Sequence, residues 1–385
     1  MKNVYIECLG LIEGHFSGVG QYILGIMRGI DELIEDNKIA GQKVPNIRAI
    51  IPYDTVKKFK EYGFKHINYK AYPIPFRYMA ALDHRNKLPF IDLWCGPGFY
   101  IFTRFAAMPL LFSEYAVIVY DLSFELYGQF SDEANAKFLS PRTRTAVNAA
   151  KKVIAISKNT KKEIVDFYHV DAKKILVATP AVDQRYLYRI SQKEIEKVKQ
   201  KYGVSGKYIL ALSNLEPRKN LDGLVDAYCD LPRNIRDGTS LLIVGVSGWK
   251  TEKLFQKIIE KVNNGYNIIR PSSYVDDNDK PAILSGAEVL VYPSHYEGFG
   301  IPPLEALACG TPVICSNNSS LPEVVGDCAS MIDSSDTDGI KEAIVKTLKD
   351  TSKKVKILHD GPKQAEQFSW RKSAQIYYDV IKENI

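Results

Sequence analysis

The chain has 385 residues, of which 45% are hydrophobic and 25% are charged. This composition is ordinary for a folded globular protein, so it excludes collagen-like and wholly disordered chains, and the length predicts two domains. The 51 basic and 45 acidic residues leave a net charge of +6. That charge suits an anionic small ligand, and it is too small to argue for a nucleic-acid partner.

Cysteine spacing and hydropathy predict a cytoplasmic protein. The six cysteines include no C-x-x-C pair, so we expect reduced thiols and neither a zinc site nor disulfides. The first ten residues carry Glu7 where a signal peptide needs its apolar stretch, and they favour a strand. The most apolar longer segment, residues 105–120, contains Pro109, Ser113 and Glu114, so no transmembrane helix is expected.

Strand-like and helical patterns alternate along the chain. In the first half we expect a helix after the turn that ends at Gly20, and strands at residues 4–9, 47–51, 116–120 and 152–156. After a polar stretch, a second series predicts strands at 208–213, 240–244, 289–292 and 313–315 and helices at 221–229, 253–262, 303–309 and 372–383. This alternation indicates parallel βαβ units in two α/β domains, which we place at residues 1–185 and 186–370.

The strongest local signal is the segment 297–305, Glu-Gly-Phe-Gly-Ile-Pro-Pro-Leu-Glu. It follows a predicted strand and runs into a helix, so its glycines let backbone amides approach a ligand where negative charge is favoured. We expect Glu305 in the first helical turn, where its carboxylate can accept hydrogen bonds from two vicinal hydroxyls, and Glu297 at the other edge of the same site. The alternative is that Glu305 only complements the helix dipole and Glu297 is solvated.

A second signal is the segment 215–220, Leu-Glu-Pro-Arg-Lys-Asn, between a predicted strand and a helix. Asn220 can cap that helix, which puts Arg218 and Lys219 beside its positive end. Two cations in that position form a candidate diphosphate site. The alternative is an exposed basic turn.

Two weaker signals lie in the first half. The loop 17–20, Ser-Gly-Val-Gly, lacks the third glycine of a dinucleotide-binding fingerprint, which argues against a dehydrogenase. Its Gly18 and Gly20 can still offer amides to a phosphate, or they form a plain tight turn. Asp121 follows a predicted buried strand, where it would face a cleft between the domains, or act only as a helix cap or a turn residue.

No metal site is expected. The six histidines show no metal-ligand spacing, and the chain has neither a P-loop nor a G-x-S-x-G motif. The segment 277–279, Asp-Asn-Asp, could hold a metal–diphosphate pair, but its position before a helix favours capping.

Together these segments resemble the pattern of glycosyltransferase family 4, which comprises retaining nucleotide-sugar transferases of the GT-B architecture. The resemblance implies an α/β fold with two Rossmann-like domains facing each other across a cleft, and a final helix, residues 371–385, that packs back on the first domain. It is dense from residue 208 to residue 370, and it rests on the segments 215–220, 292–306, 309–313, 320–324 and 368–370.

The resemblance implies roles for the residues of the second domain. Arg218 and Lys219 would hold the donor diphosphate and stabilise its charge as it leaves. Glu305 would bind the donor ribose, and Glu297 would contact hydroxyls of the transferred sugar. The backbone amides of Phe299 and Gly300 would assist.

In the first domain, Gly18 and Gly20 match the family's glycine loop, which approaches the diphosphate. Asp121 matches the second residue of a His-Asp pair, although Tyr120 replaces the histidine here. We therefore count Asp121, together with the two cations and Glu297, as the catalytic candidates.

The family mechanism needs no side-chain nucleophile, because the acceptor hydroxyl attacks from the front face and loses its proton to the leaving phosphate. Arg218 and Lys219 can neutralise that phosphate, so neither a metal nor a cofactor is expected. The nucleotide-sugar itself is a substrate.

Residues 53–90 contain eight basic and three acidic residues interleaved with aromatic residues. Aromatic rings can stack on sugars and lysines can attract anionic lipid headgroups. This stretch is therefore a candidate for contact with the acceptor or with an anionic inner membrane face. The alternative is a solvated, partly disordered insertion.

The leading hypothesis is a hexosyltransferase that moves a sugar from a nucleotide donor to a glycan or lipid-linked acceptor in cell-surface polysaccharide synthesis. The motifs are most similar to those of bacterial mannosyl- and rhamnosyl-type transferases, which favours GDP-mannose as the donor. Two alternatives stay open, namely a disaccharide synthase with a soluble acceptor and a non-catalytic nucleotide- or glycan-binding relative.

Overall fold

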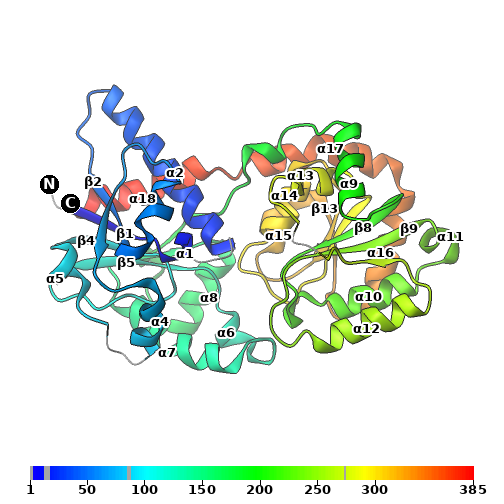
Figure 1. Ribbon diagram of the computed structural model, residues 1–385, viewed down its shortest axis with the longest axis horizontal. Helices are drawn as coiled ribbons and strands as arrows, with labels where there is room; N and C mark the ends of the chain where they lie inside the picture. The colour runs from blue at the N-terminus through cyan, green and yellow to red at the C-terminus, as the bar shows by residue number, and fades with distance from the viewer. Residues whose placement is uncertain (1–2, 13–17, 85–87, 273–274) are drawn as a thin grey trace. The chain divides into compact units, whose positions relative to one another are not determined.

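The structure is a computed structural model that describes residues 3–12, 18–84, 88–272 and 275–385. The chain divides into two compact units, of which the first comprises Met1–Pro180 and Ser369–Ile385 and the second Ala181–Phe368. These boundaries lie a few residues before the predicted ones at 185 and 370. Each unit contains one open parallel sheet flanked by helices (Figure 1).

The sheet of the first unit has the strand order β3-β2-β1-β4-β5-β6-β7, and all its pairings are parallel. Its five inner strands are mostly apolar and buried, as expected for a parallel sheet covered on both faces, whereas the edge strand β3 is more exposed. The order reverses between β1 and β4, which makes this the topological switch point. The strands are β1 (Asn3–Glu7), β2 (Asn46–Pro52), β3 (Asn68–Tyr72), β4 (Gly98–Phe102), β5 (Glu114–Val119), β6 (Lys152–Ala155) and β7 (Ile175–Val177).

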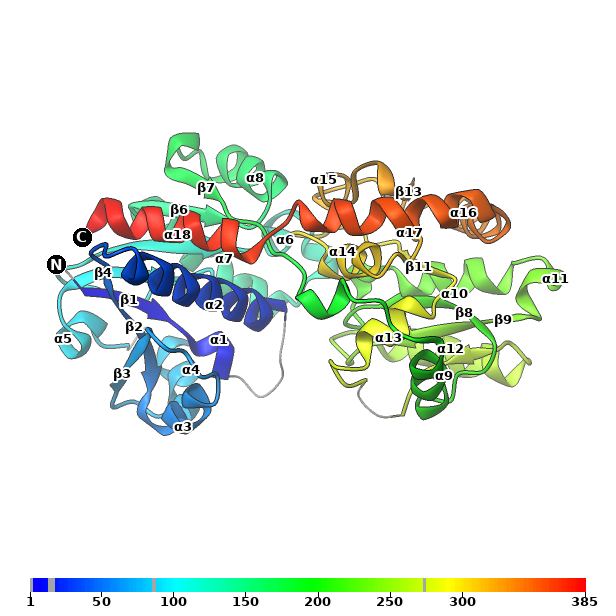
Figure 2. The same cartoon turned by 90° about the horizontal axis from the view of Figure 1, so that it is seen from above.

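The last helix of the chain belongs to the first unit, where it lies beside α2 (Figure 2). A Cβ atom on Gly29 would lie 2.6 Å from the Cβ of Ala374, so the glycine allows the two helices to approach closely. The Tyr22 and Tyr377 hydroxyls are 3.0 Å apart across the same contact. The helices of this unit are α1 (Leu9–Ile12), α2 (Gly18–Ile39), α3 (Val56–Lys60), α4 (Phe76–His84), α5 (Ile91–Cys95), α6 (Ser123–Leu126), α7 (Glu133–Ala149), α8 (Lys158–Tyr168) and α18 (Trp370–Asn384).

The second unit repeats the same topology with six parallel strands in the order β10-β9-β8-β11-β12-β13. This is the Rossmann strand order, and its switch point lies between β8 and β11. The strands are β8 (Lys207–Leu212), β9 (Thr239–Val244), β10 (Ile268–Ile269), β11 (Val289–Tyr292), β12 (Val313–Ser316) and β13 (Ala329–Ile332).

Helices pack against this second sheet and close its core, which includes the buried side chains of Leu224, Tyr228 and Ile243. Strands and helices alternate along this unit, in keeping with successive βαβ units. The helices are α9 (Gln192–Lys201), α10 (Leu221–Cys229), α11 (Arg233–Arg236), α12 (Glu252–Asn263), α13 (Lys280–Ser285), α14 (Ile301–Ala308), α15 (Leu321–Val325), α16 (Thr337–Lys349) and α17 (Thr351–Glu366).

The basic, aromatic stretch at 53–90 is part of the first unit's fold. It supplies α3, the edge strand β3 and α4, and Phe59 and Tyr72 are buried. The described residues therefore form regular secondary structure, which contradicts the disordered part of the alternative, a solvated and partly disordered insertion, although many of them are exposed to solvent; residues 85–87 lie outside the described ranges. Tyr53 and Tyr78 remain about half exposed, at 55% and 48%.

None of the helices in the described ranges is both long enough and apolar enough to cross a membrane. The six cysteines form no disulfide with one another.

Candidate active site

The Rossmann topology brings the two strongest sequence motifs together. β8 leads into the segment that carries Arg218 and Lys219, and β11 leads into the loop before α14. Because these strands flank the switch point, both segments emerge at the carboxyl edge where open α/β sheets bind ligands. A backbone hydrogen bond of 2.7 Å from the His295 amide to the Arg218 carbonyl joins them directly.

Arg218, Lys219 and Glu297 form one ion-pair cluster. The Lys219 ammonium lies 2.5 Å from Glu297 Oε1, and Arg218 Nη1 lies 3.1 Å from Glu297 Oε2. Arg218 Nε also pairs with Glu216 Oε2 at 3.1 Å. Lys219 and Glu297 are only 6% and 5% exposed, so the alternatives of an exposed basic turn and a solvated glutamate are wrong.

The cluster controls the protonation of its members. Burial by itself would raise the pKa of Glu297, but the adjacent Lys219 and Arg218 cations outweigh it and lower the pKa to about 2. Burial, reinforced by Arg218, lowers the pKa of Lys219. Glu297 is therefore a carboxylate at neutral pH, which suits it to accept hydrogen bonds and not to donate a proton.

Two serines before α15 hold the loop that contains Glu297. The Glu297 amide donates to Ser319 Oγ at 3.0 Å, and Ser320 Oγ lies 2.8 Å from the carbonyl oxygens of both Glu297 and Phe299. Gly300 then starts α14 with φ +109°, and a Cβ there would lie 2.7 Å from the Leu321 side chain. Only glycine fits this conformation comfortably, so the chain turns sharply into the helix after Phe299.

Glu305 lies in the second turn of α14, so its predicted place in the first turn is wrong. The reason is that the helix begins at Ile301, directly after Gly300. The Glu305 carboxylate is 4% exposed and lies beside the Tyr186 phenol. Burial and this carboxylate raise the pKa of Tyr186.

Asn220 caps α10, as predicted. Its side-chain oxygen accepts a hydrogen bond from the Gly223 amide at 3.2 Å, and its backbone is left-handed at φ +49°. Its side-chain amide donates to the Ser334 carbonyl, and His295 Nδ1 lies 3.0 Å from Ser334 Oγ. Ser334 also lines a cavity of about 360 Å³ at the ends of β12 and β13, so this space lies on the carboxyl edge beside Asn220 and His295.

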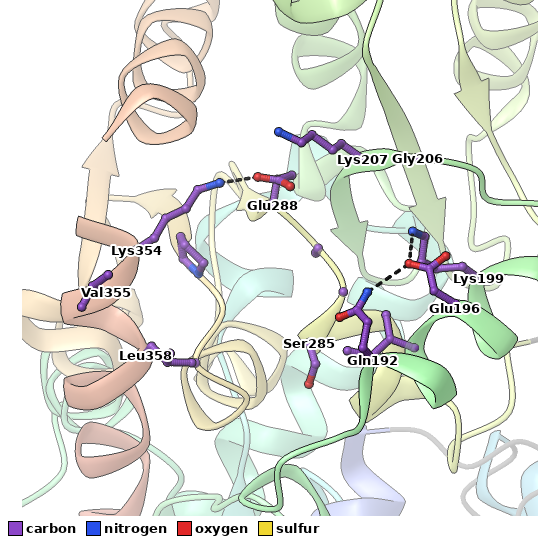
Figure 3. Close-up of a pocket in the computed structure, with 15 residues that line it drawn as sticks. Gln192, Glu196, Lys199, Gly206, Lys207, Ser285, Glu288, Lys354, Val355 and Leu358 are labelled. Atoms are coloured by element: carbon purple, nitrogen blue, oxygen red, sulfur yellow. Dashed lines mark hydrogen bonds and ion pairs between the residues drawn. The ribbon is translucent and has the colours of Figure 1, made fainter. Parts of the chain in front are cut away.

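Another cavity, of about 520 Å³, lies at the opposite, amino edge of the second sheet (Figure 3). Lys207 opens β8 there, and Glu288 directly precedes β11 and pairs with Lys354 of α17. None of the predicted site residues lines this cavity. The predicted site is thus on the carboxyl edge.

The first-unit candidates have local roles in the structure. Gly18 and Gly20 lie in the first turn of α2 and not in a loop, which corrects the prediction; Ser17 lies outside the described residues. Asp121 accepts hydrogen bonds from the Ser123 amide and hydroxyl at 2.9 and 2.7 Å, in keeping with the turn alternative. The ligand roles of these residues remain predictions.

Within the described residues, no group of three or more His, Cys, Asp or Glu side chains is arranged to hold a metal ion. Asp277 pairs with Lys280 at 2.6 Å. Asp279 stands at the helix start but accepts from Lys201 and the Tyr202 hydroxyl, both at 2.6 Å, so the prediction of side-chain capping is wrong.

Sequence reasoning missed two partners of the cluster. The Tyr292 hydroxyl, at the end of β11, accepts a hydrogen bond from the Lys219 ammonium at 3.0 Å. Glu216 holds the other side of Arg218. Their positions in the sequence could have revealed both residues. Tyr292 ends a strand at the switch point, and Glu216 lies inside the segment 215–220 that carries Arg218 and Lys219.

The fold has close counterparts among solved glycosyltransferases. HepE of Anabaena, solved with UDP and glucose, superposes with a TM-score of 0.73 at 15% identity over 99% of this chain and 100% of that one. WaaG, a glycosyltransferase involved in lipopolysaccharide biosynthesis, gives a TM-score of 0.69 at 16% identity over 98% and 99%. These likenesses show the GT-B fold, and the predicted pair of Rossmann-like domains is confirmed.

Sequence comparison defines the family. Residues 192–364 match the model of the group 1 glycosyl transferases. The O-antigen chain mannosyltransferase B of Escherichia coli is 34% identical over 279 residues, which cover 72% of this chain and 71% of that protein. The chain therefore belongs to the group 1 glycosyl transferases.

Two further relatives match over shorter shares of their length. The O-antigen chain mannosyltransferase RfbU of Salmonella typhimurium is 28% identical over 63% of each chain. The serotype-specific mannosyltransferase WbdA of Escherichia coli is 28% identical over 229 residues, which span 28% of that protein. The predicted resemblance to bacterial mannosyltransferases is confirmed.

Proposed function

We propose that the protein transfers mannose from GDP-mannose, with retention of configuration, to a glycan or lipid-linked acceptor during synthesis of a cell-surface polysaccharide. The relatives named as O-antigen mannosyltransferases support the sugar and the pathway. The observation that carries the site is the convergence of Arg218, Lys219 and Glu297 at the switch point of the second sheet.

The charges of the cluster suit a diphosphate donor. The formal charges of the cluster sum to zero, because the two cations offset the carboxylates of Glu216 and Glu297. An arriving diphosphate would therefore compete with Glu297 for the two cations. Such binding would partly release the Glu297 carboxylate to accept hydrogen bonds from the sugar. The donor is thus recognised at its phosphates and its hexose by the same cluster.

The remaining donor contacts follow the family roles. Glu305 would accept hydrogen bonds from the ribose hydroxyls, and the Phe299 and Gly300 amides would approach the sugar phosphate. The Ser320 hydroxyl, which binds the carbonyls of Glu297 and Phe299, keeps that loop in shape. Positioning of this kind supplies much of the rate enhancement in group transfer.

The chemistry needs charge stabilisation and no side-chain nucleophile. As the glycosidic bond breaks, Arg218 and Lys219 would stabilise the leaving diphosphate, and the acceptor hydroxyl would pass its proton to that phosphate. Glu297, with a pKa of about 2, stays ionised throughout. We therefore propose a hexosyltransferase that requires neither a metal ion nor a cofactor.

We assign the acceptor to the first unit, with Asp121 as a catalytic contact and with Gly18 and Gly20 near the diphosphate. We also propose that the enzyme works in the cytoplasm and attaches peripherally to an anionic membrane face through the stretch 53–90. The exposed rings of Tyr53 and Tyr78 and the basic residues of that stretch support the attachment.

A donor screen tests the proposal. The unfolding temperature of the full chain would be measured with GDP-mannose, UDP-glucose, dTDP-rhamnose and ADP-glucose. Only GDP-mannose should raise it strongly. At one hundred times its dissociation constant, the donor should add about 2.7 kcal/mol to the unfolding free energy. The variant Glu305→Gln serves as the control, since it should lose this gain. Stabilisation by a UDP-sugar alone would overturn the assigned donor.

A further inference from the structure

The first sheet has its own switch point, and an unexplained polar cluster lies on its carboxyl edge. Glu7 ends β1, Arg104 stands two residues beyond the end of β4, and Tyr72 ends β3. Because β1 and β4 flank the reversal of strand order, these side chains gather where open α/β sheets bind ligands.

Glu7 is the buried anchor of this cluster. It is 2% exposed, and its carboxylate accepts hydrogen bonds from the Leu9 amide at 2.7 Å, the Thr103 amide at 3.2 Å and the Thr103 hydroxyl at 2.8 Å. These neutral donors satisfy the oxygen atoms but leave the negative charge in place. A buried charge of this kind needs a nearby cation.

Arg104 supplies that cation but donates no hydrogen bond to the Glu7 carboxylate. Its Nε lies 3.6 Å from Glu7 Oε1, within ion-pair distance but too far for a hydrogen bond, and this Nε has no hydrogen-bond partner among the described residues. The Arg104 side chain is 37% exposed. Glu7 therefore holds a partly exposed guanidinium in place and leaves it donors for an outside partner.

Tyr72 provides an independent sign of a binding site. It is 1% exposed, and its hydroxyl makes no hydrogen bond to any part of the chain that the structure describes. Burial and the Glu7 carboxylate raise its pKa while Arg104 opposes them, so the hydroxyl lies within electrostatic reach of both. A buried hydroxyl without a partner is costly and calls for an explanation.

We propose that Arg104 and the Tyr72 hydroxyl bind a phosphate group of the acceptor at the switch point of the first sheet. A phosphate offers only acceptor oxygens, which suit the planar fork of an arginine and the O–H donor of a tyrosine. The same chemistry fits the diphosphate of a lipid-linked glycan and the phosphate of a soluble sugar phosphate. This inference rests on the proposed transferase function, because it deepens the identity of the acceptor.

Calorimetric titration of the full chain tests the site and its ligand. The chain is first titrated with GDP, which reports the donor site, and then with geranyl diphosphate and, separately, with mannose 6-phosphate. At least one of the two should bind, whereas geraniol and mannose should not, and the better probe distinguishes the lipid-linked source from the soluble one. Arg104→Ala should weaken that binding by roughly ten- to a hundredfold and leave GDP binding unchanged.

The matched control is Arg144→Ala, which removes an exposed arginine of the same unit that stacks over Phe167 and Tyr168. It should leave the affinity for both probes unchanged. If the chain bound GDP but neither probe, or if Arg104→Ala bound the probe as the natural chain does, the inference would be overturned. Probe binding through Arg104 without GDP binding would instead contradict the proposed donor alone.

Tyr72→Phe separates a ligand contact from a structural one. Because the hydroxyl has no described protein partner, the variant should unfold at the same temperature or higher, yet bind the phosphate probe more weakly. A lower unfolding temperature with unchanged probe affinity would show a structural hydroxyl and refute its role. Should Arg104→Ala fail to fold, Arg104→Lys keeps the charge but not the planar fork, and it should still weaken probe binding.

Discussion

The Lys219 ammonium and the Glu297 carboxylate lie 2.5 Å apart, although 78 residues separate them in the sequence. Both side chains are almost fully buried. Because an isolated buried charge is expensive, each of these residues depends on the other for its ionised state. The pair therefore links the stability of the second unit to the chemistry proposed for it.

This pair should give the unfolding free energy a specific dependence on pH. The pKa of Glu297 is about 2 in the folded chain, below its ordinary value of 4.5. Its contribution to stability is therefore fully present above about pH 4.5 and is lost as the pH falls toward 2. Urea denaturation across this range should show a steeper loss for the natural chain than for Glu297→Gln, which cannot titrate. Equal pH dependence in the two proteins would contradict the assignment.

Removing the cations should lower both activity and stability. Arg218→Ala and Lys219→Ala should each reduce turnover by roughly 10²–10³-fold, the loss typical for one electrostatic stabiliser. Lys219→Ala should also lower the unfolding free energy by about 3–5 kcal/mol, because it breaks a buried pair. The double variant Lys219→Met, Glu297→Gln is the control, since it removes both charges and should regain stability without regaining transfer. Normal turnover in both single variants would show that the cations do not serve catalysis.

Transfer should not depend on divalent metal ions. Since protein cations are proposed to neutralise the leaving diphosphate, the rate in EDTA should match the rate in added Mg²⁺ or Mn²⁺. The measurement is donor turnover after exhaustive chelation. Complete loss that Mn²⁺ restores would direct attention to Asp277 and Asp279.

Gly18→Ala should distinguish a helix residue from a ligand contact. Gly18 opens α2, and a Cβ there would meet no atom within 4 Å, so the substitution should keep stability or raise it by up to about 1 kcal/mol. If the glycine approaches the donor diphosphate, transfer should nevertheless fall by at least about tenfold. Activity equal to that of the natural chain would show that Gly18 opens the helix and does not contact the donor.

Deleting residues 371–385 should cost transfer more than donor affinity. The deletion removes Ala374 and Tyr377, which pack against Gly29 and Tyr22 of α2, so it should disrupt the first unit. Apart from Gly18 and Gly20, the donor candidates lie in the second unit, so calorimetry should still detect GDP binding. Tyr377→Phe, which removes one hydroxyl of this contact, should keep most activity. Undiminished transfer after the deletion would refute a role for this helix.

Local sequence signals predicted much of the second unit. The strand Val289–Tyr292 and the helix Leu221–Cys229 have the predicted bounds, because a buried apolar run and the Asn220 cap are encoded within a few neighbouring residues. The same local reasoning misplaced Glu305 by one turn. The left-handed backbone of Gly300 starts α14 earlier than its prolines indicate.

Sequence by itself therefore determined the α/β class, the two motifs and the family resemblance, since these depend on periodicity and on short runs of residues. Only the tertiary structure decided which charges meet. The strand order places the ends of β8 and β11 side by side, which buries Lys219 against Glu297, and the ends of β1 and β4 side by side, which sets Arg104 against Glu7. No local pattern encodes such neighbours, because they are far apart along the chain and meet only when the sheets form.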